Sequence, residues 1–367
     1  MNAVLIVDKP AGLTSHDVVN RVRRILDQRS VGHLGTLDPM ATGVLPIVIG
    51  NFTRLAQFYV SSEKAYEGTV RFGFCTDTYD AEGEPTSEQN EVTLQPEDLE
   101  SAVAKFRGVI EQTPPPFSAK KIKGVPAYKL ARKQKNVTLQ PVQVEIKQLE
   151  VLGVDVDRMR FRARVTSGTY MRSVAHDLGR ALGCGAHLES LRRTAVAEFA
   201  IEDAHTLEEL ATSAGESHAG KADVGTLGLS RAPRLRLSTK TSTNLSNSLS
   251  STPEERPFKG RVDDKNHDPG LISSLSVSSP HTALEDSGTD PQPLLELFVH
   301  PRQLLPQMPC VTADELTAAR IRAGRTVNLP ELSRARQVKV FAGQRDLIAI
   351  ATRVAGTLFH PKIVLCS

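Results

Sequence analysis

One carboxylate, that of Asp38, lies in a segment whose composition suits nucleophilic or acid–base chemistry. Residues 32–50 read GHLGTLDPMATGVLPIVIG, and the apolar, β-branched run at residues 44–49 is typical of a buried strand. An Asp-Pro pair often only closes a turn through its own backbone. A carboxylate held beside a buried strand needs a partner for its charge, however, and proteins that keep such a group often use it for chemistry.

Two groups of cations have a composition that suits phosphate binding. Residues 120–135 read KKIKGVPAYKLARKQK, with seven lysines and arginines and no acid. In residues 158–165 arginines alternate with apolar residues, which predicts a half-buried strand with a cationic outer face. A charge run is usually only a solvated surface, but seven cations without an acid repel one another and suit the phosphates of RNA. Two such groups favour RNA over a small anionic ligand. We expect RNA-backbone contacts from Lys120, Lys121, Lys123 and Arg132.

The elements that must position these groups are short strands and helices. Alternation in residues 64–72 predicts a strand with Tyr66 on its apolar face, where by default it is a core aromatic with a solvated hydroxyl. Arg172 is expected at a strand-to-helix junction, where an arginine can simply be a cap or a surface ion pair. The other predicted elements are a strand at residues 4–7, a helix capped by Thr14 or Ser15, helices at residues 52–58 and 99–106, and a helix that ends at Gly183.

Composition limits the class of protein. The 367 residues are enough for two domains, and the net charge is only +3, so any basic surface must come from local clustering. The four cysteines include no C-x-x-C pair, which argues against a disulfide framework or a zinc knuckle and favours a reducing cytoplasm. The N-terminal apolar run is too short for a signal peptide, and no segment is long enough to span a membrane. We therefore expect a soluble cytoplasmic protein.

A change of composition divides the chain. Residues 213–293 are rich in Ser, Thr, Pro and Asn, contain one aromatic residue, and are predicted to be disordered. The predicted domains are residues 1–212, the low-complexity insert at 213–293, and residues 294–367. In this last part the patterns predict a helix at 313–323 and strands at 337–341, 347–353 and 358–365.

The motifs closely resemble those of bacterial TruB-type tRNA pseudouridine synthases. The matching blocks are GHLGTLDP and ATGVLP around Asp38, the opening DKPAGLTSHDVV, TDTYDAEG at residues 76–83, and SGTYMRSVAHDLGRALGCGAHLESLRRTAV at residues 167–196. The resemblance covers nearly all of residues 1–210 and is absent from the insert. Residues 306–367 resemble, more weakly, a PUA-like RNA-binding domain. The fold class that this implies is α/β (α+β), a mixed-sheet pseudouridine synthase domain followed by a small β-rich domain.

The resemblance also assigns roles to single residues. It implies that Asp38 is catalytic and that Arg172 pairs with it, which would supply the partner that a buried carboxylate needs. It implies that Tyr66 stacks on the target base and that Leu191 lines the uracil pocket. His33, by default a satisfied loop histidine, would help to open the T-loop of tRNA. Lys9 and Pro10 would support the active-site loop without touching the substrate.

The activity implied is the conversion of uridine to pseudouridine in the T-loop of tRNA, at position 55. The base would have to leave the RNA stack. Asp38 either bonds to the sugar or removes the C2′ proton, and the sequence leaves both open. No cofactor and no metal are expected, the partner is the T-arm of tRNA, and we expect a monomer that needs no protein partner. Two alternatives are a guide-RNA-dependent pseudouridine synthase subunit and an RNA-binding protein that folds tRNA.

Overall fold

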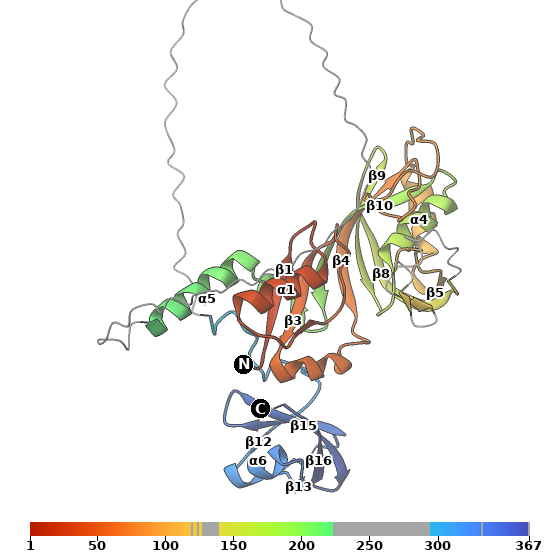
Figure 1. Ribbon diagram of the computed structural model, residues 1–367. Helices are drawn as coiled ribbons and strands as arrows, with labels where there is room; N and C mark the ends of the chain where they lie inside the picture. The colour runs from red at the N-terminus through yellow and green to blue at the C-terminus, as the bar shows by residue number, and fades with distance from the viewer. Residues whose placement is uncertain (119, 123–124, 127–138, 223–293, 332, 366–367) are drawn as a thin grey trace, which may run out of the picture. The chain divides into compact units, whose positions relative to one another are not determined.

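The computed structural model describes residues 1–118, 120–122, 125–126, 139–222, 294–331 and 333–365 (Figure 1). Its larger sheet has nine strands, and the parallel pair β3–β10 among antiparallel neighbours makes the sheet mixed, as predicted. Its main path runs through β1 (Ala3–Lys9), β3 (Thr42–Ile49), β10 (Ala186–Val196), β4 (Lys64–Phe72), β9 (Arg158–Val165), β8 (Val142–Asp155) and β5 (Gly108–Gln112), with β2 (Val31–His33) paired to β3 and β11 (Phe199–Ala200) paired to β10.

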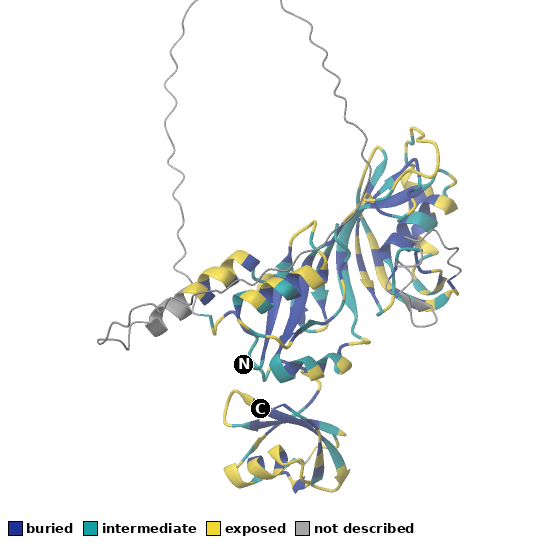
Figure 2. Cartoon of the chain, in the orientation of Figure 1, coloured by how far each residue is buried: buried dark blue, intermediate teal, exposed yellow. Residues whose placement is uncertain are grey.

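The core of this sheet follows the alternation of the sequence. In β9 the apolar residues are buried and the arginines between them face outward. Tyr66, Val70 and Phe72 are buried on one face of β4, as predicted. Figure 2 shows the same distinction, with buried positions along the strands and exposed positions on the outer sides of the helices. Hydrophobic burial on one face therefore fixes the register of the strands that carry the site.

Helices are present at each segment of this part where one was predicted, with different ends, and the described residues include two more that were not predicted. The predicted cap of α1 (Ser15–Ile25) is present, because Thr14 and Asp17 form a capping box. The segment predicted as a helix at residues 52–58 is the 3₁₀ helix η1 (Gly50–Phe58). The remaining helices among the described residues of this part are α2 (Pro96–Ala104) and α4 (Met171–Ala181), which were predicted, and the short η2 (Ile201–Asp203) and α5 (Leu207–Ala222), which were not. Helix α5 packs against α1.

The predicted boundary at residue 212 lies inside α5. Residues 213–222, which composition placed in the insert, are helical; alanines are frequent there and favour a helix. Residues 223–293 of the insert lie outside the described residues. No helix in the described ranges is both long and apolar enough to cross a membrane.

The C-terminal residues form a second sheet with its own core. Its five strands, in sheet order, are β12 (Cys310–Ala313), β14 (Gln337–Ala342), β15 (Asp346–Ala355), β16 (Leu358–Val364) and β13 (Val327–Asn328), and α6 (Glu315–Arg322) packs against them. The predicted helix and strands of this region are all present. A small hairpin of β6 (Lys121–Ile122) and β7 (Val125–Pro126) lies in the lysine-rich segment.

Candidate active site

Asp38 lies in the loop between β2 and β3, and a buried lysine supports that loop. Lys9 is fully buried, and its Nζ donates to the carbonyl oxygens of Pro10, Leu13 and Pro39 at 2.8, 2.7 and 3.1 Å. Burial lowers the pKa of Lys9 to about 8, and nearby carboxylates, Glu82 and then Asp38, oppose this shift. The structure thus gives Lys9 the supporting position that the family resemblance implied.

A second buried cation, Arg193, supports the loop from the side of β10. Its Nε donates to the carbonyl of Val44 at 2.8 Å, and its two terminal nitrogens donate to the carbonyls of Thr36 and Gly35 at 3.2 and 3.1 Å. Gly43 is required beside it, because its φ is +99° and a Cβ would lie 2.2 Å from the carbonyl oxygen of Arg193. Sequence reasoning did not single out Arg193. The only signal was its place in the LRRTAV end of the family block.

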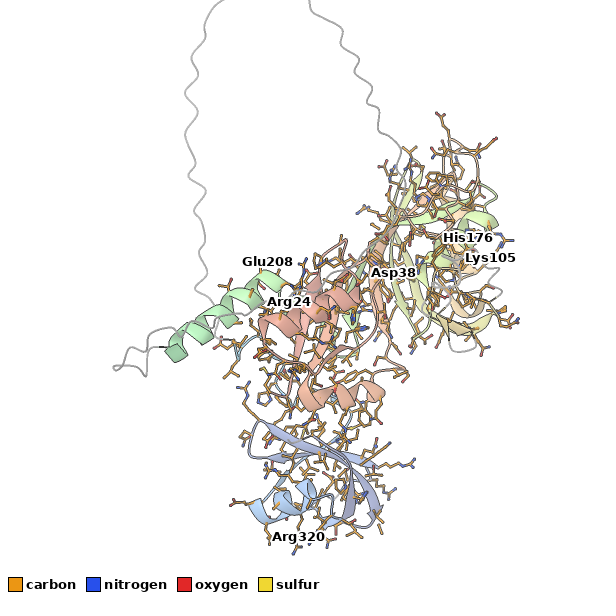
Figure 3. The ribbon with its side chains drawn as sticks, in the orientation of Figure 1. Arg24, Asp38, Lys105, His176, Glu208 and Arg320 are labelled. Atoms are coloured by element: carbon orange, nitrogen blue, oxygen red, sulfur yellow. The ribbon has the colours of Figure 1, made fainter. Side chains whose placement is uncertain are left out.

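The loop also contacts the starts of two helices. Ser15, the first residue of α1, accepts a hydrogen bond from the Leu37 amide at 2.8 Å and donates to the Leu37 carbonyl at 3.1 Å. Arg172, the second residue of α4, reaches Asp38 itself. Asp38 is labelled in Figure 3, where the surrounding side chains are drawn as sticks. The two helices and two buried cations leave the loop little freedom.

The predicted ion pair between Asp38 and Arg172 is present. Nε of Arg172 lies 2.9 Å from Oδ2 of Asp38, but the N–H is not aligned well enough for a hydrogen bond, so the contact is an ion pair only. The two terminal nitrogens donate to the carbonyls of Thr78 and Phe117, each at 3.0 Å. Only 5% of the Arg172 side chain is exposed, against 36% for Asp38. The carboxylate is therefore half-buried, which differs from the buried group expected from the sequence.

A second carboxylate, Asp80, shares the same guanidinium. Its Oδ2 lies 3.5 Å from Nη1 of Arg172, and its side chain is 5% exposed. Asp80 accepts hydrogen bonds from the Thr78 hydroxyl at 2.5 Å and from the Glu82 amide at 3.1 Å. The sequence placed Asp80 inside a family block but gave it no role. Its position suggests that it fixes Arg172 from the side away from the solvent, because an arginine with a buried second partner keeps its orientation.

The residues predicted to bind substrate meet at one cavity of about 430 Å³. This is in the range of small-ligand pockets. Tyr66 and Leu191 are almost fully buried in its wall. Burial, and next the charge of Arg193, lower the pKa of His33, so this histidine is neutral at neutral pH. The predicted residues at this cavity are His33, Asp38, Tyr66, Arg172 and Leu191; sequence reasoning missed Tyr59, Lys64 and Tyr170, which also line it.

The structure describes only some of the residues predicted to contact the RNA backbone. Lys120 is half-buried, and its Nζ lies 3.4 Å from the carbonyl of Gln140. Lys121 is in β6, but its side chain lies outside the described residues, as do Lys123 and Arg132 altogether. Phosphate binding by these four residues therefore stays a prediction.

The arginines of β9 carry less free charge than the sequence suggested. The three that have acidic partners take them from other strands of the sheet, β4 and β10, or from the turns at strand ends, which residue spacing within β9 could not reveal. The pairs are Arg158 with Glu189 at 2.9 Å and Asp157 at 2.6 Å, Arg162 with Glu67 at 2.8 Å, and Arg164 with Glu63 at 3.2 Å. The arginines do lie on the outer face, as predicted, but at these three positions acidic partners neutralise part of their charge.

Comparison with known proteins gives matches to one family. Residues 23–171 match the family model described as "TruB family pseudouridylate synthase (N terminal domain)", and residues 172–225 match "tRNA pseudouridylate synthase B C-terminal domain". A relative from Solibacter usitatus, "tRNA pseudouridine synthase B", is 42% identical over the whole length of both chains. The chain belongs to the TruB family. A relative of the same name from Aquifex aeolicus is 47% identical, over 58% of this chain and 75% of its own.

Solved structures agree on the fold of this TruB-family chain. One, titled "Structure of H/ACA RNP bound to a substrate RNA containing 2'-deoxyuridine", matches with a TM-score of 0.59 and 19% identity over 100% of this chain and 85% of that chain. A second, "Crystal Structure of a Cbf5-Nop10-Gar1 Complex", has the same TM-score at 20% identity and covers 99% of this chain and 85% of that one. At this identity the likeness shows the fold alone. The TruB-family enzyme is thus a tRNA pseudouridine synthase with an α/β fold and mixed sheet, as predicted.

Proposed function

We propose that this enzyme converts uridine to pseudouridine at position 55, in the T-loop of tRNA, and that Asp38 is its catalytic residue. The observation that carries the proposal is the contact of 2.9 Å between Asp38 and Arg172 at a cavity that is also lined by Tyr66 and Leu191. A half-exposed carboxylate beside a fixed guanidinium is both charged and accessible, which a group that attacks or takes a proton requires.

The reaction moves the ribose from one atom of the uracil to another within the same nucleotide. The bond from ribose C1′ to uracil N1 breaks and C1′ joins to C5; C5 then loses its proton and N1 gains one, so the atoms balance and no electrons are gained or lost overall. In one route the Asp38 carboxylate bonds to C1′ as N1 leaves, much as a glycosidase carboxylate does, and is released when C5 attacks C1′; in the other it removes the C2′ proton as N1 leaves and returns that proton when C1′ joins C5. In both routes Arg172 holds the carboxylate at the sugar side of the base. No group of three or more His, Cys, Asp or Glu side chains in the described part of the chain is arranged to hold a metal ion.

The cavity also has the groups needed to hold a base that has left the RNA stack. Unstacking costs a few kcal/mol, and stacking on an aromatic ring returns about 1–3 kcal/mol. Tyr66 has its ring in the cavity wall, and Leu191 supplies an apolar contact. His33 is uncharged at neutral pH, because of its lowered pKa, so it can occupy the space left by the flipped base without bringing an unpaired charge into the stack.

The experiment that tests this proposal uses the purified full chain and an unmodified tRNA transcript, with pseudouridine mapped at single-nucleotide resolution. We expect one modified position, in the T-loop, and none with Asp38→Asn. A transcript in which the T-loop uridine is replaced by cytidine should remain unmodified. Modification at another position, or only in the presence of an added guide RNA, would overturn the T-loop proposal in favour of a different RNA site or of the guided class.

The tRNA-folding alternative has a separate readout. If Asp38→Asn still speeds the refolding of a tRNA transcript while making no pseudouridine, folding is a second activity of the same surface. If wild type also speeds refolding and makes no pseudouridine, tRNA folding is the only activity of this surface. We further expect a monomer acting without a protein partner, in the cytoplasm where its tRNA substrate is made; sedimentation of the chain with and without tRNA tests the first of these.

A further inference from the structure

The active-site cavity contains a lysine to which the proposed reaction gives no role. Lys64, the first residue of β4, lines the same cavity as Asp38 and Tyr66. Its Cε lies 3.7 Å from the place that a Cβ on Gly35 would take, so its stem runs along the loop that carries Asp38. Its side chain is half-buried. Lys64 is thus built into the wall of the site and is not a freely moving surface lysine.

The charge of Lys64 has no carboxylate partner among the described residues. Its Nζ donates to the Ser62 carbonyl at 2.6 Å, and no acid lies within ion-pair distance. An ammonium group has three donors, so two remain for another ligand. Burial, and next the positive charge of Arg193, lower the pKa of Lys64 to about 8. The free enzyme therefore holds this charge at a cost, and an anion brought beside it would remove that cost.

The other cations of the site are already engaged. Arg172 contacts Asp38 and two backbone carbonyls, and Arg193 is fully buried with all three of its donating nitrogens on carbonyls. Among the described residues that line this cavity, Lys64 is the cation that has unused hydrogen-bond donors and no acidic partner. Thr169, in the same wall, has a buried hydroxyl without a hydrogen-bond partner in the described part of the chain. The Lys64 ammonium group favours a negatively charged ligand, and the Thr169 hydroxyl can donate a hydrogen bond to such a ligand.

We propose that Lys64 is the binding site for one of the two backbone phosphates that flank the target uridine. This rests on the proposed function, because it takes the flipped uridine to lie in this cavity. When a nucleotide leaves the stack, the phosphates on either side of it are drawn to the mouth of the pocket that receives the base. A lysine is a compact point charge that suits a single phosphate. Lys64 is then a positioning residue, which places the sugar against Asp38 through the chain that carries it.

The first test compares charge and shape at this position. Lys64→Met keeps the length of the stem and removes the charge, and Lys64→Arg keeps the charge. Binding of a T-arm hairpin is measured in the Asp38→Asn background, so that the substrate is not consumed. We expect Lys64→Met to weaken binding about tenfold and to lower the slope of log affinity against log salt by about 0.7–0.9, and Lys64→Arg to restore most of both.

Two controls separate this effect from a general loss of charge or of structure. Lys105, an exposed lysine at the end of α2, is changed to Met in the same background; it lies outside the cavity and should leave affinity and slope unchanged. Thermal unfolding shows whether Lys64→Met is folded. An unchanged salt slope in folded Lys64→Met would overturn the proposal and leave Lys64 a structural residue that only holds the Ser62 carbonyl.

The second test identifies the phosphate. Two hairpins are made in which either the 5′ or the 3′ phosphate of the target uridine is replaced by an uncharged methylphosphonate. We expect one replacement to weaken binding to the Asp38→Asn protein as much as Lys64→Met does, and to have no further effect on Lys64→Met. Additive losses, or no loss with either hairpin, would overturn the proposal.

These outcomes are distinct from a failure of the proposed function. That function is tested first with wild type on the unaltered tRNA transcript. If wild type modifies a uridine elsewhere, the same phosphate replacements are placed around that uridine, and the expected coupling with Lys64 is unchanged.

Discussion

Removal of the Arg193 guanidinium is the sharpest test of how the active-site loop is held. Arg193→Met preserves an unbranched stem of similar length and leaves the carbonyls of Gly35, Thr36 and Val44 without their donor. Each buried acceptor left unpaired costs roughly 1–3 kcal/mol, and removing the buried charge returns part of this. We expect a net loss of about 3–5 kcal/mol in the free energy of unfolding, the range typical of breaking a buried polar network.

The same change should slow the chemical step. Thr36 is two residues from Asp38, so loosening the loop displaces the carboxylate relative to the sugar. A displacement of about 1 Å at a reacting group lowers the rate by roughly 100-fold. Urea unfolding gives the loss of stability, and single-turnover pseudouridine formation at saturating enzyme gives the rate of the step on bound RNA. Arg193→Lys can donate to only part of the three carbonyls, so it should fall between wild type and Arg193→Met in both measurements.

The adjacent arginine on β10 is a matched control. Arg192 has an exposed side chain and pairs with Asp8 at 2.7 Å, with 42% and 30% of the two side chains exposed. Arg192→Met removes the same charge from the same strand and should cost less than about 1 kcal/mol, as surface ion pairs do. If Arg193→Met loses no more stability or rate than Arg192→Met, the three hydrogen bonds do not hold the loop and the reasoning fails.

The remaining predictions concern the ion pair and the lysine-rich segment. Asp38→Asn should abolish turnover while tRNA binding stays within a few-fold; a rate within tenfold of wild type, about 1.4 kcal/mol of barrier, would contradict the assignment. Arg172→Ala should lower the single-turnover rate by roughly 100-fold or more, since it leaves two carboxylates without their partner; an unchanged rate would mean that the pair has no part in the reaction. Replacing Lys120, Lys121 and Lys123 with Ala should weaken tRNA binding and lower its salt slope by about 0.9 for each duplex phosphate that the protein no longer neutralises; a slope equal to that of wild type would mean that these lysines face water.

Local signals predicted the elements well where each element is fixed by its own residues. Alternation placed the strand at residues 64–72, where β4 has the same bounds, and Thr14 with Asp17 marked the start of α1. The ends that shifted, at η1 and α2, are those where tertiary packing decides how far a turn continues, and α5 was not predicted at all. Sheet order was not predictable in detail, because it depends on contacts between strands far apart in the sequence.

That dependence on sheet order explains which parts of the site were missed. The resemblance identified Asp38 and Arg172, and the structure brings them within 2.9 Å. The acids that pair with the arginines of β9 come from other strands and from the turns at strand ends, so no spacing within residues 158–165 could reveal them. Arg193 was missed for a related reason. Its partners are backbone carbonyls of a distant loop, and a carbonyl acceptor leaves no mark in the sequence.

The choice of partners for the buried cations has a consequence for Asp38. Lys9 and Arg193 direct their hydrogen bonds to carbonyl oxygens of or beside the loop that carries Asp38, not to carboxylates. A carbonyl satisfies a donor without cancelling the charge of the cation. The two cations therefore fix the loop through hydrogen bonds and still leave positive charge behind Asp38, whose negative charge acts on both of them. With an aspartate in place of either set of carbonyls, the loop would still be held by hydrogen bonds, but the Asp38 carboxylate, which we propose acts on the sugar, would lose this electrostatic support.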